Sequence, residues 1–117
     1  IDRDRALARA EAGYSTATDL ADYLVRAEVP FRTAYDVVKR LVMDRLADGR
    51  AIADLSAAEL RAYHPAFEDD ALNAATVPAS VAARDVPGGT APVRVAAAVE
   101  ASKQLVECAR AHWASRV

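Results

Sequence analysis

The chain has 117 residues and a mass of 12.5 kDa, a length typical of one domain. Its 15 basic and 17 acidic side chains give a net charge of −2, which excludes the strongly basic footprint of a nucleic-acid-binding module. Hydrophobic residues make up 53% of the chain, too many for a disordered segment, and the 29 alanines favour closely packed helices.

The cysteine count and the hydropathy restrict the compartment. The single cysteine, Cys108, excludes an internal disulfide and a CxxC metal or redox pair. No apolar run approaches the ~20 residues of a membrane span, and the N-terminal IDRDRALARA is no signal peptide. We therefore expect a cytoplasmic protein that binds neither membranes nor nucleic acid. Because the sequence begins with Ile1 rather than methionine, we also expect it to be a piece of a longer chain.

The first half of the chain predicts three helices. Residues 1–12 have the composition of the last turns of a helix, and Gly13 stands where a helix C-terminal glycine belongs. Apolar side chains recur at helical spacing over residues 16–27 and, most clearly, over 31–48, which Gly49 ends. The residues predicted to be buried together are Leu20, Tyr23, Leu24, Phe31, Val38, Leu41, Val42 and Leu60.

The second half predicts a short helix, an irregular segment and a long last helix. Ser56 and Glu59 fit the S-x-x-E capping box, and that helix should end before His64, which precedes a proline. Another turn or two is expected within 67–75. The prolines and glycines of 77–92 predict irregular structure.

The last helix is expected over residues 91–115, with Thr90 as its N-cap and Pro92 in its first turn. Its Val99, Val106 and Trp113 fit either a stripe for a partner helix or ordinary core packing. No convincing strand occurs, so the predicted fold is an all-α bundle of about six helices.

Few residues are candidates for chemistry. His64 and His112 have no metal ligands at suitable spacing, and capping or exposure explains both. Cys108 is predicted to be a small buried hydrophobic residue. Gly88, Gly89 and Thr90 precede a helix and form a weak anion-site candidate, since backbone amides at a helix N-terminus attract anions. A tight turn into the last helix is the alternative.

One series of motifs resembles the C-terminal domain of argininosuccinate lyase. GYSTATDLADYLV at residues 13–25, followed by Pro30-Phe31-Arg32 and Ala34, is similar to the start of that domain. The later pieces also follow the order of the family and cover nearly the whole chain: Leu55-Ser56, Glu59-Leu60, Pro65, Ala79-Ser80-Val81, Arg84 and Gly88-Gly89-Thr90-Ala91-Pro92.

This resemblance implies part of a large homotetrameric lyase of the fumarase and aspartase superfamily. The parent enzyme would reversibly cleave argininosuccinate into arginine and fumarate by β-elimination, in arginine biosynthesis. Residues 1–12 would end a helix of the central bundle, and residues 13–117 would form a single helical C-terminal domain. The partners implied are the rest of the subunit and its homotetramer, and a small-molecule substrate binds only in the full enzyme.

The resemblance also implies that the catalytic groups lie elsewhere. The catalytic serine of the family belongs to a central-domain loop of the pattern GSSxMPxKxN, whereas the only methionine here, Met43, is followed by Asp44. We therefore assign no catalytic, cofactor-binding or metal-binding residue to this chain, and no cofactor.

The expected contribution of the domain is closure over an active site, about a hinge at Gly13, Tyr14 and Ser15. Gly13 is expected to take a positive φ, with the body from residue 16 onward moving as a unit. Two alternatives stay open: a domain of a paralogous C–N lyase that acts on another amine–fumarate adduct, or a free-standing helical interaction module. At two positions this chain departs from the family pattern, with Tyr35 in place of His and Lys39 in place of Gly, which fits a divergent orthologue or such a paralogue.

Overall fold

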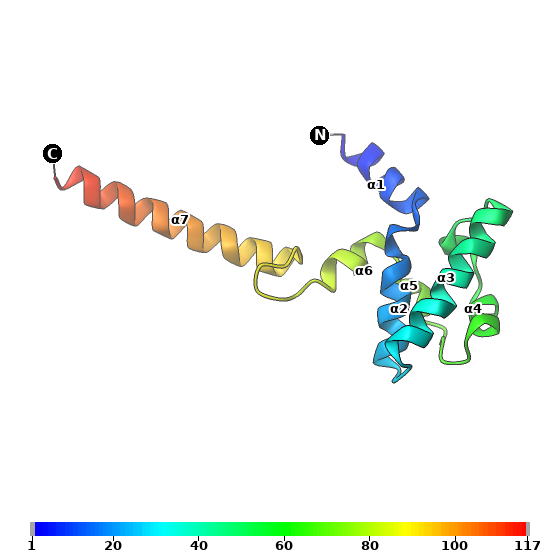
Figure 1. Cartoon of the computed structure of the whole chain (residues 1–117). Helices are drawn as coiled ribbons and strands as arrows, with labels where there is room; N and C mark the ends of the chain where they lie inside the picture. The colour runs from blue at the N-terminus through cyan, green and yellow to red at the C-terminus, as the bar shows by residue number, and fades with distance from the viewer. Residues whose placement is uncertain (1, 117) are drawn as a thin grey trace. The chain divides into compact units, whose positions relative to one another are not determined.

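A computed structural model describes residues 2–116, which divide into two compact units between Ser80 and Val81. Two short 3-10 helices, η1 (Tyr14–Thr16) and η2 (Ile52–Asp54), join longer elements of the first unit. No strand occurs among residues 2–116, and the predicted all-α fold is confirmed. The α-helices in chain order are α1 (Arg3–Ala12), α2 (Ala17–Arg26), α3 (Phe31–Asp48), α4 (Ala57–Tyr63), α5 (Ala71–Ala74), α6 (Val77–Ala82) and α7 (Pro92–Ala114) (Figure 1).

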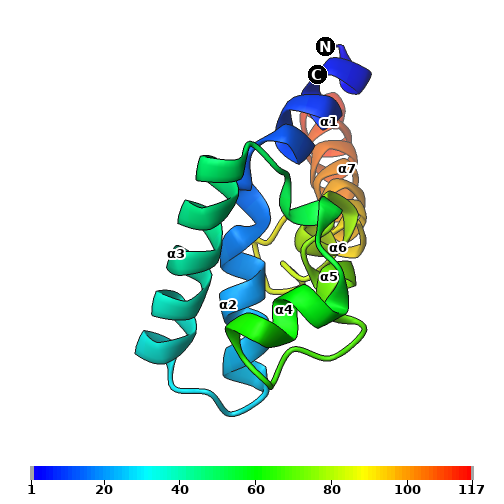
Figure 2. The ribbon, with the colours of Figure 1, turned by 90° about the vertical axis from the view of Figure 1, so that its right-hand side faces the viewer.

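The hydrophobic core belongs to the first unit and centres on the packing of α2 against α3. Figures 1 and 2 show these helices side by side, and α5 also packs on α2. The largest fully buried side chains come from α2, α3, α4 and the segment before α5, so that elements distant in sequence share one core. These side chains are Leu20, Leu24, Leu41, Leu60 and Phe67.

Most of the predicted core is confirmed. Seven of its eight members lie in the core cluster or pack against it; Tyr23 and Val42 are partly buried there. The prediction is wrong for Phe31, which is 63% exposed. Helical periodicity defined a broad apolar face on α3, but its buried part is only the strip of Ala34, Val37, Val38, Leu41 and Arg45.

Two predicted helix ends have the expected local geometry. Gly49 follows α3 with φ 67°, a left-handed conformation that glycine adopts without steric cost. Ser56 caps α4, and Glu59 completes the capping box. α4 ends at Tyr63, before the His64-Pro65 pair, as the sequence predicted.

The prediction that residues 77–92 are irregular throughout is wrong, because α6 occupies Val77–Ala82. Thr76 starts this helix: its hydroxyl accepts from the N–H of Ala79 at 3.3 Å, and its carbonyl accepts from the N–H of Ser80 at 2.9 Å. Pro78 is the second residue of α6, where a missing N–H costs nothing. Proline therefore marked a helix start here rather than a break.

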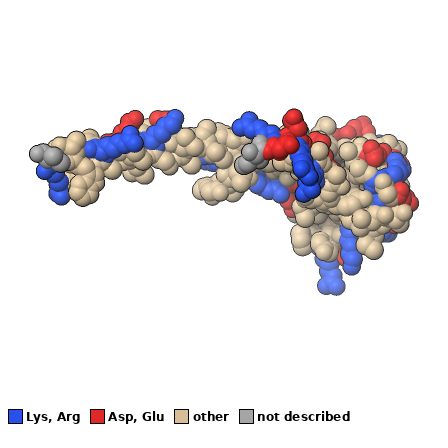
Figure 3. Space-filling model, turned by 90° about the horizontal axis from the view of Figure 1, so that it is seen from above, with Lys and Arg blue, Asp and Glu red and all other residues tan. Residues whose placement is uncertain are grey.

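α7 begins one residue later than predicted. Ala91 is its N-cap and Pro92 its first residue, so the assignment of Thr90 as the cap is wrong. No residue described in α7 is buried, and Cys108 is exposed, which corrects its prediction as a buried residue. In Figure 3 the charged side chains of α7 lie along one edge of the visible face, and uncharged atoms cover the rest.

Among residues 2–116, no helix combines the length and the apolarity that crossing a membrane requires.

Candidate functional site

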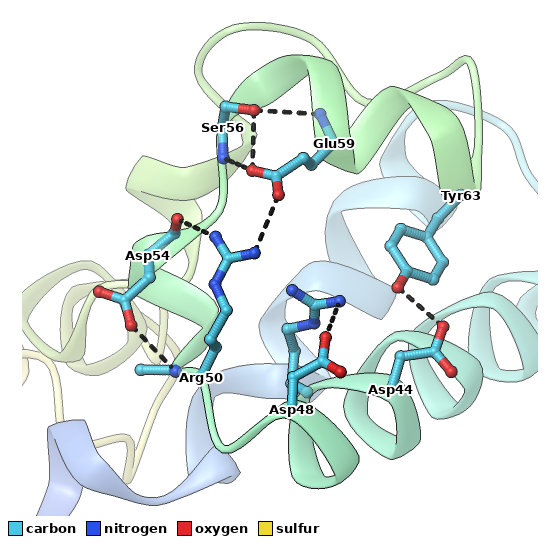
Figure 4. A network of polar contacts seen from close by, with 9 residues as sticks. Asp44, Asp48, Arg50, Asp54, Ser56, Glu59 and Tyr63 are labelled. Atoms are coloured by element: carbon cyan, nitrogen blue, oxygen red, sulfur yellow. Dashed lines mark hydrogen bonds and ion pairs between the residues drawn. The ribbon is translucent and has the colours of Figure 1, made fainter.

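A polar network connects the segment after α3 to the start of α4 (Figure 4). Arg50 donates through Nη1 to Oε1 of Glu59 at 3.1 Å and through Nη2 to the carbonyl oxygen of Asp54 at 2.9 Å. Glu59 Oε2 accepts from the N–H of Ser56 at 2.7 Å and from its hydroxyl at 2.9 Å. The N–H of Ala51 donates to Asp54 Oδ2 at 3.1 Å. These bonds connect residues 50–56 to one another and to the first turn of α4.

The same bonds perturb the acid at the centre of the network. The N–H of Ser56, its hydroxyl and the Arg50 guanidinium all favour the ionised form of Glu59 and lower its pKa from 4.5 to about 2. A carboxylate whose pKa is lower in the folded state stabilises that state above the unfolded pKa and loses this contribution as the pH falls. The pH window of this effect therefore runs from about 4.5 down to about 2.

We expect Glu59→Gln to weaken the pH dependence of stability in this window. At pH 7 the variant should unfold at lower urea concentration than the wild type, and the difference should shrink as the pH is lowered toward 2. Urea denaturation followed by circular dichroism at pH 7, 4 and 3 measures this on the isolated chain. Glu11→Gln is the control, since Glu11 is exposed in α1 and forms no ion pair with a described residue. A constant difference between Glu59→Gln and the wild type across these pH values would contradict the prediction.

A cavity of about 350 Å³ lies between α3 and α4 beside this network. Tyr63 Oη donates to Asp44 Oδ2 at 2.8 Å, and burial together with this bond raises the pKa of the phenol. Arg40 donates to the carbonyl oxygen of Tyr63 at 3.3 Å, and Arg45 pairs with Asp48 at 2.8 Å. Two hydrogen bonds, from Tyr63 to Asp44 and from Arg40 to the Tyr63 carbonyl, therefore join α4 to α3, while the Arg45–Asp48 ion pair lies within α3. The cavity is lined by Arg40, Arg45, Leu55, Glu59, Ala62 and Tyr63.

The predicted hinge residues lie between α1 and α2. Gly13 has φ −88° and ψ 158°, an extended conformation, so the prediction of a positive φ at this glycine is wrong. α1 ends without a left-handed residue: the N–H of Gly13 still donates to the carbonyl of Arg9, the extended backbone of Gly13 stops the helix, and η1 follows directly. A Cβ at Gly13 would lie 3.5 Å from that carbonyl oxygen, an ordinary contact.

Two side chains connect the hinge segment to its neighbours. Tyr14 Oη donates to the carbonyl oxygen of Arg50 at 3.1 Å, and its ring packs against the core. Ser15 Oγ donates to the carbonyl oxygen of Ala10 in α1 at 3.0 Å. Tyr14 is therefore attached to the body of the first unit, and Ser15 reaches back to α1, so any rotation about Gly13 must break the Ser15 bond.

Gly88 and Gly89 form part of a turn in the second unit. Gly88 has φ 80°, and the N–H of Gly89 donates to the carbonyl oxygen of Val86 at 2.8 Å, which places Pro87 and Gly88 at the centre of a β-turn. A Cβ on Gly89 would lie only 2.0 Å from the carbonyl oxygen of Arg84. Turn geometry thus accounts for both glycines, while anion binding by residues 88–90 stays a prediction. A groove of about 590 Å³ runs from this turn along α7.

The histidines occupy structural positions. His64 is the C-cap of α4, and its Nδ1 accepts from the N–H of Ala66 at 3.2 Å rather than satisfying a helix carbonyl. The ring of His112 contacts Trp113 edge to face, at 6.2 Å between centroids. Neither imidazole is hydrogen-bonded to a carboxylate or hydroxyl side chain in the part of the chain that the structure describes.

Within residues 2–116, no three His, Cys, Asp or Glu residues are grouped so that they could hold a metal ion.

Sequence reasoning found only part of the network around Glu59. The S-x-x-E spacing identified Ser56 and Glu59, because both partners are local in sequence. It missed Arg50, nine residues before Glu59, and the Tyr14 bond, which spans 36 residues. No local motif encodes contacts of this separation.

Comparison with known proteins places these features in a family. The profile described as argininosuccinate lyase C-terminal matches residues 14–82, more than half of the chain. Argininosuccinate lyase of Bordetella avium is 52% identical over 95 residues, which are 81% of this chain and 20% of that protein. Argininosuccinate lyase of Thioalkalivibrio sulfidiphilus is 47% identical over 96 residues, 82% of this chain and 21% of that protein.

A more distant relative gives similar coverage. Argininosuccinate lyase of Thermus thermophilus is 44% identical over 104 residues, which are 89% of this chain and 22% of that protein. The chain therefore spans about a fifth of the length of the curated relatives that it matches.

Proposed function

This chain belongs to the argininosuccinate lyase C-terminal family, and from that premise we propose that it serves as the non-catalytic C-terminal domain of an argininosuccinate lyase-like enzyme. The observation that carries the proposal is the match over residues 14–82, supported by relatives at 42–52% identity that are all named argininosuccinate lyase. The parent enzyme would cleave argininosuccinate reversibly into arginine and fumarate.

The arrangement of the side chains supports a non-catalytic role. β-Elimination needs a base that removes a proton from carbon and an acid that protonates the departing nitrogen. The carboxylates of the packed network instead pair with arginine, tyrosine or backbone N–H groups: Asp44 and Asp70 accept from tyrosine hydroxyls, and Glu59, with a pKa of about 2, is a very weak base. We therefore assign the proton transfers to the remaining four-fifths of the lyase.

The contribution of this domain would be structural closure of the active site. In this proposal the chain is attached to the rest of the subunit through residues 1–12 and pivots at Gly13, whose extended backbone precedes η1. Closure excludes water and completes a site without donating a catalytic group. The parent enzyme would be a cytoplasmic homotetramer that binds its small-molecule substrate only in the full assembly.

The test compares the isolated chain with the full-length protein that contains it. We expect the full-length protein to release fumarate from argininosuccinate, followed by the absorbance of fumarate, and the isolated chain to remain at the buffer background. Turnover by the isolated chain that survives repurification would overturn the non-catalytic role. If the full-length protein does not cleave argininosuccinate but cleaves another amine–fumarate adduct, the substrate assignment is wrong and the reaction class is retained.

A further inference from the structure

α3 carries a second apolar strip, most of which the core leaves exposed. Phe31, Tyr35, Val42 and Leu46, which we call the α3 outer stripe, follow one another at intervals of four, seven and four residues and therefore share one side of the helix. Phe31 is 63% exposed, Tyr35 53% and Leu46 57%, whereas Val42 packs partly against the core. The rings of Phe31 and Tyr35 lie 6.3 Å apart and form one surface.

The stripe is adjacent to the buried face of α3, and the two together cover about half of the helix circumference. A helix that packs against one layer needs a stripe of only about 100°, and a wider apolar face is typical of a helix with neighbours on two sides. Large apolar side chains that are exposed singly need no explanation, but a contiguous group indicates an interaction surface. We therefore expect a second layer to cover the α3 outer stripe.

The charges beside the stripe indicate the chemistry of that layer. Arg32 and Lys39 are exposed along one edge, and neither pairs with a carboxylate of a described residue. A complementary partner would place carboxylates opposite this edge. A second copy of the stripe fits poorly: its midpoint lies between Val38 and Lys39, so a two-fold pairing would bring the two Lys39 ammonium groups together.

The length of the matching lyases indicates what covers the α3 outer stripe. The argininosuccinate lyases that match this chain are about five times longer than the matched region, so most of a lyase subunit lies outside it. We propose that the α3 outer stripe docks on an apolar surface edged by carboxylates in the remaining part of the lyase chain. This inference rests on the proposed function and goes beyond it by naming the surface through which the domain is held.

The experiment measures how accessible the stripe is in the full-length protein. In a Cys108→Ser background, single cysteines are introduced as Tyr35→Cys or Leu46→Cys within the stripe. Asp36→Cys is the matched control, because Asp36 is exposed on α3 about 100° from Tyr35. Ala34→Cys reports on folding, since Ala34 is fully buried. Each variant is labelled with a maleimide as the full-length protein and as the isolated chain, and fumarate release is assayed on the same full-length samples.

In the full-length protein, Tyr35→Cys and Leu46→Cys should label about tenfold or more slowly than Asp36→Cys, because labelling then requires local opening of the interface. In the isolated chain all three should label at similar rates. Equal rates in the full-length protein would overturn the proposal. Slow labelling of the stripe in the isolated chain, slower still at higher protein concentration, would assign the surface to a second copy and also overturn it. Slow labelling of the stripe in a full-length protein that releases no fumarate from argininosuccinate would support the docking surface and contradict the proposed reaction.

Discussion

Replacing Leu41 by alanine is expected to lower the free energy of unfolding of the first unit by about 2–5 kcal/mol. Leu41 lies in the middle of α3 and has no exposed surface, and it belongs to the same core cluster as Leu20 and Leu24 of α2. Removing three carbons there loses their transfer free energy and leaves a cavity, since the packed side chains around it relax only in part. Urea denaturation of the isolated chain, followed by the helical circular dichroism signal, measures the change.

Leu46→Ala is the matched control for this experiment. It makes the same chemical change five residues later on the same helix, where the leucine is 57% exposed. In the isolated chain it should change the free energy of unfolding by about 0.5 kcal/mol or less. A neutral Leu41→Ala, or equal effects at the two positions, would mean that α3 is rotated relative to the arrangement described above.

Gly89→Ala is expected to disrupt the turn that precedes α7. Its Cβ would lie 2.0 Å from the carbonyl oxygen of Arg84 and 2.9 Å from that of Val86, and both obstacles are backbone atoms that cannot rotate away. The N–H of Ala91 donates to the same Arg84 carbonyl at 3.4 Å, so the substitution should also weaken this bond. We expect a cost of about 1–3 kcal/mol, typical of overpacking, and an increase of roughly tenfold or more in the amide exchange rate at Ala91.

Gly13→Ala provides the contrast. The backbone of Gly13 is extended and open to any residue, and the added Cβ would make an ordinary contact with Arg9. Alanine restricts the unfolded chain, so the variant should be stabilised by about 0.4–1 kcal/mol. Hydrogen exchange and urea denaturation on both variants distinguish the positions. Clear destabilisation by Gly13→Ala would contradict the unstrained, extended backbone at that residue. Unchanged amide exchange at Ala91 in the Gly89→Ala variant would contradict the expected disruption of the turn.

The helices and their ends could be predicted well where the determinants are local. α3 runs over the predicted residues 31–48, and Gly49 takes the left-handed conformation that ends it. The capping box of Ser56 and Glu59 has the geometry that its spacing implies. These features depend on residues within one or two turns of each other, so a single sequence contains all of the information needed.

Prediction failed where a residue type permits two local outcomes. The sequence pattern predicts an irregular segment around Pro78, although proline suits the first turn of a helix as well as a loop. Gly13 was assigned a positive φ, although glycine also adopts extended backbone. Which outcome is realised depends on neighbouring hydrogen bonds, such as the cap that Thr76 provides to α6.

The sequence by itself determined the family, the all-α class and the leucines of the core, because periodicity and short motifs record which residues share a helix face. Tertiary structure alone decided how much of that face is covered. Phe31 and Leu41 lie on the same broad apolar side of α3, yet one is exposed and the other is buried. The physical reason is that burial depends on which elements pack against the helix. Contacts such as Tyr14 with Arg50 and Arg50 with Glu59 likewise form only once separate segments meet.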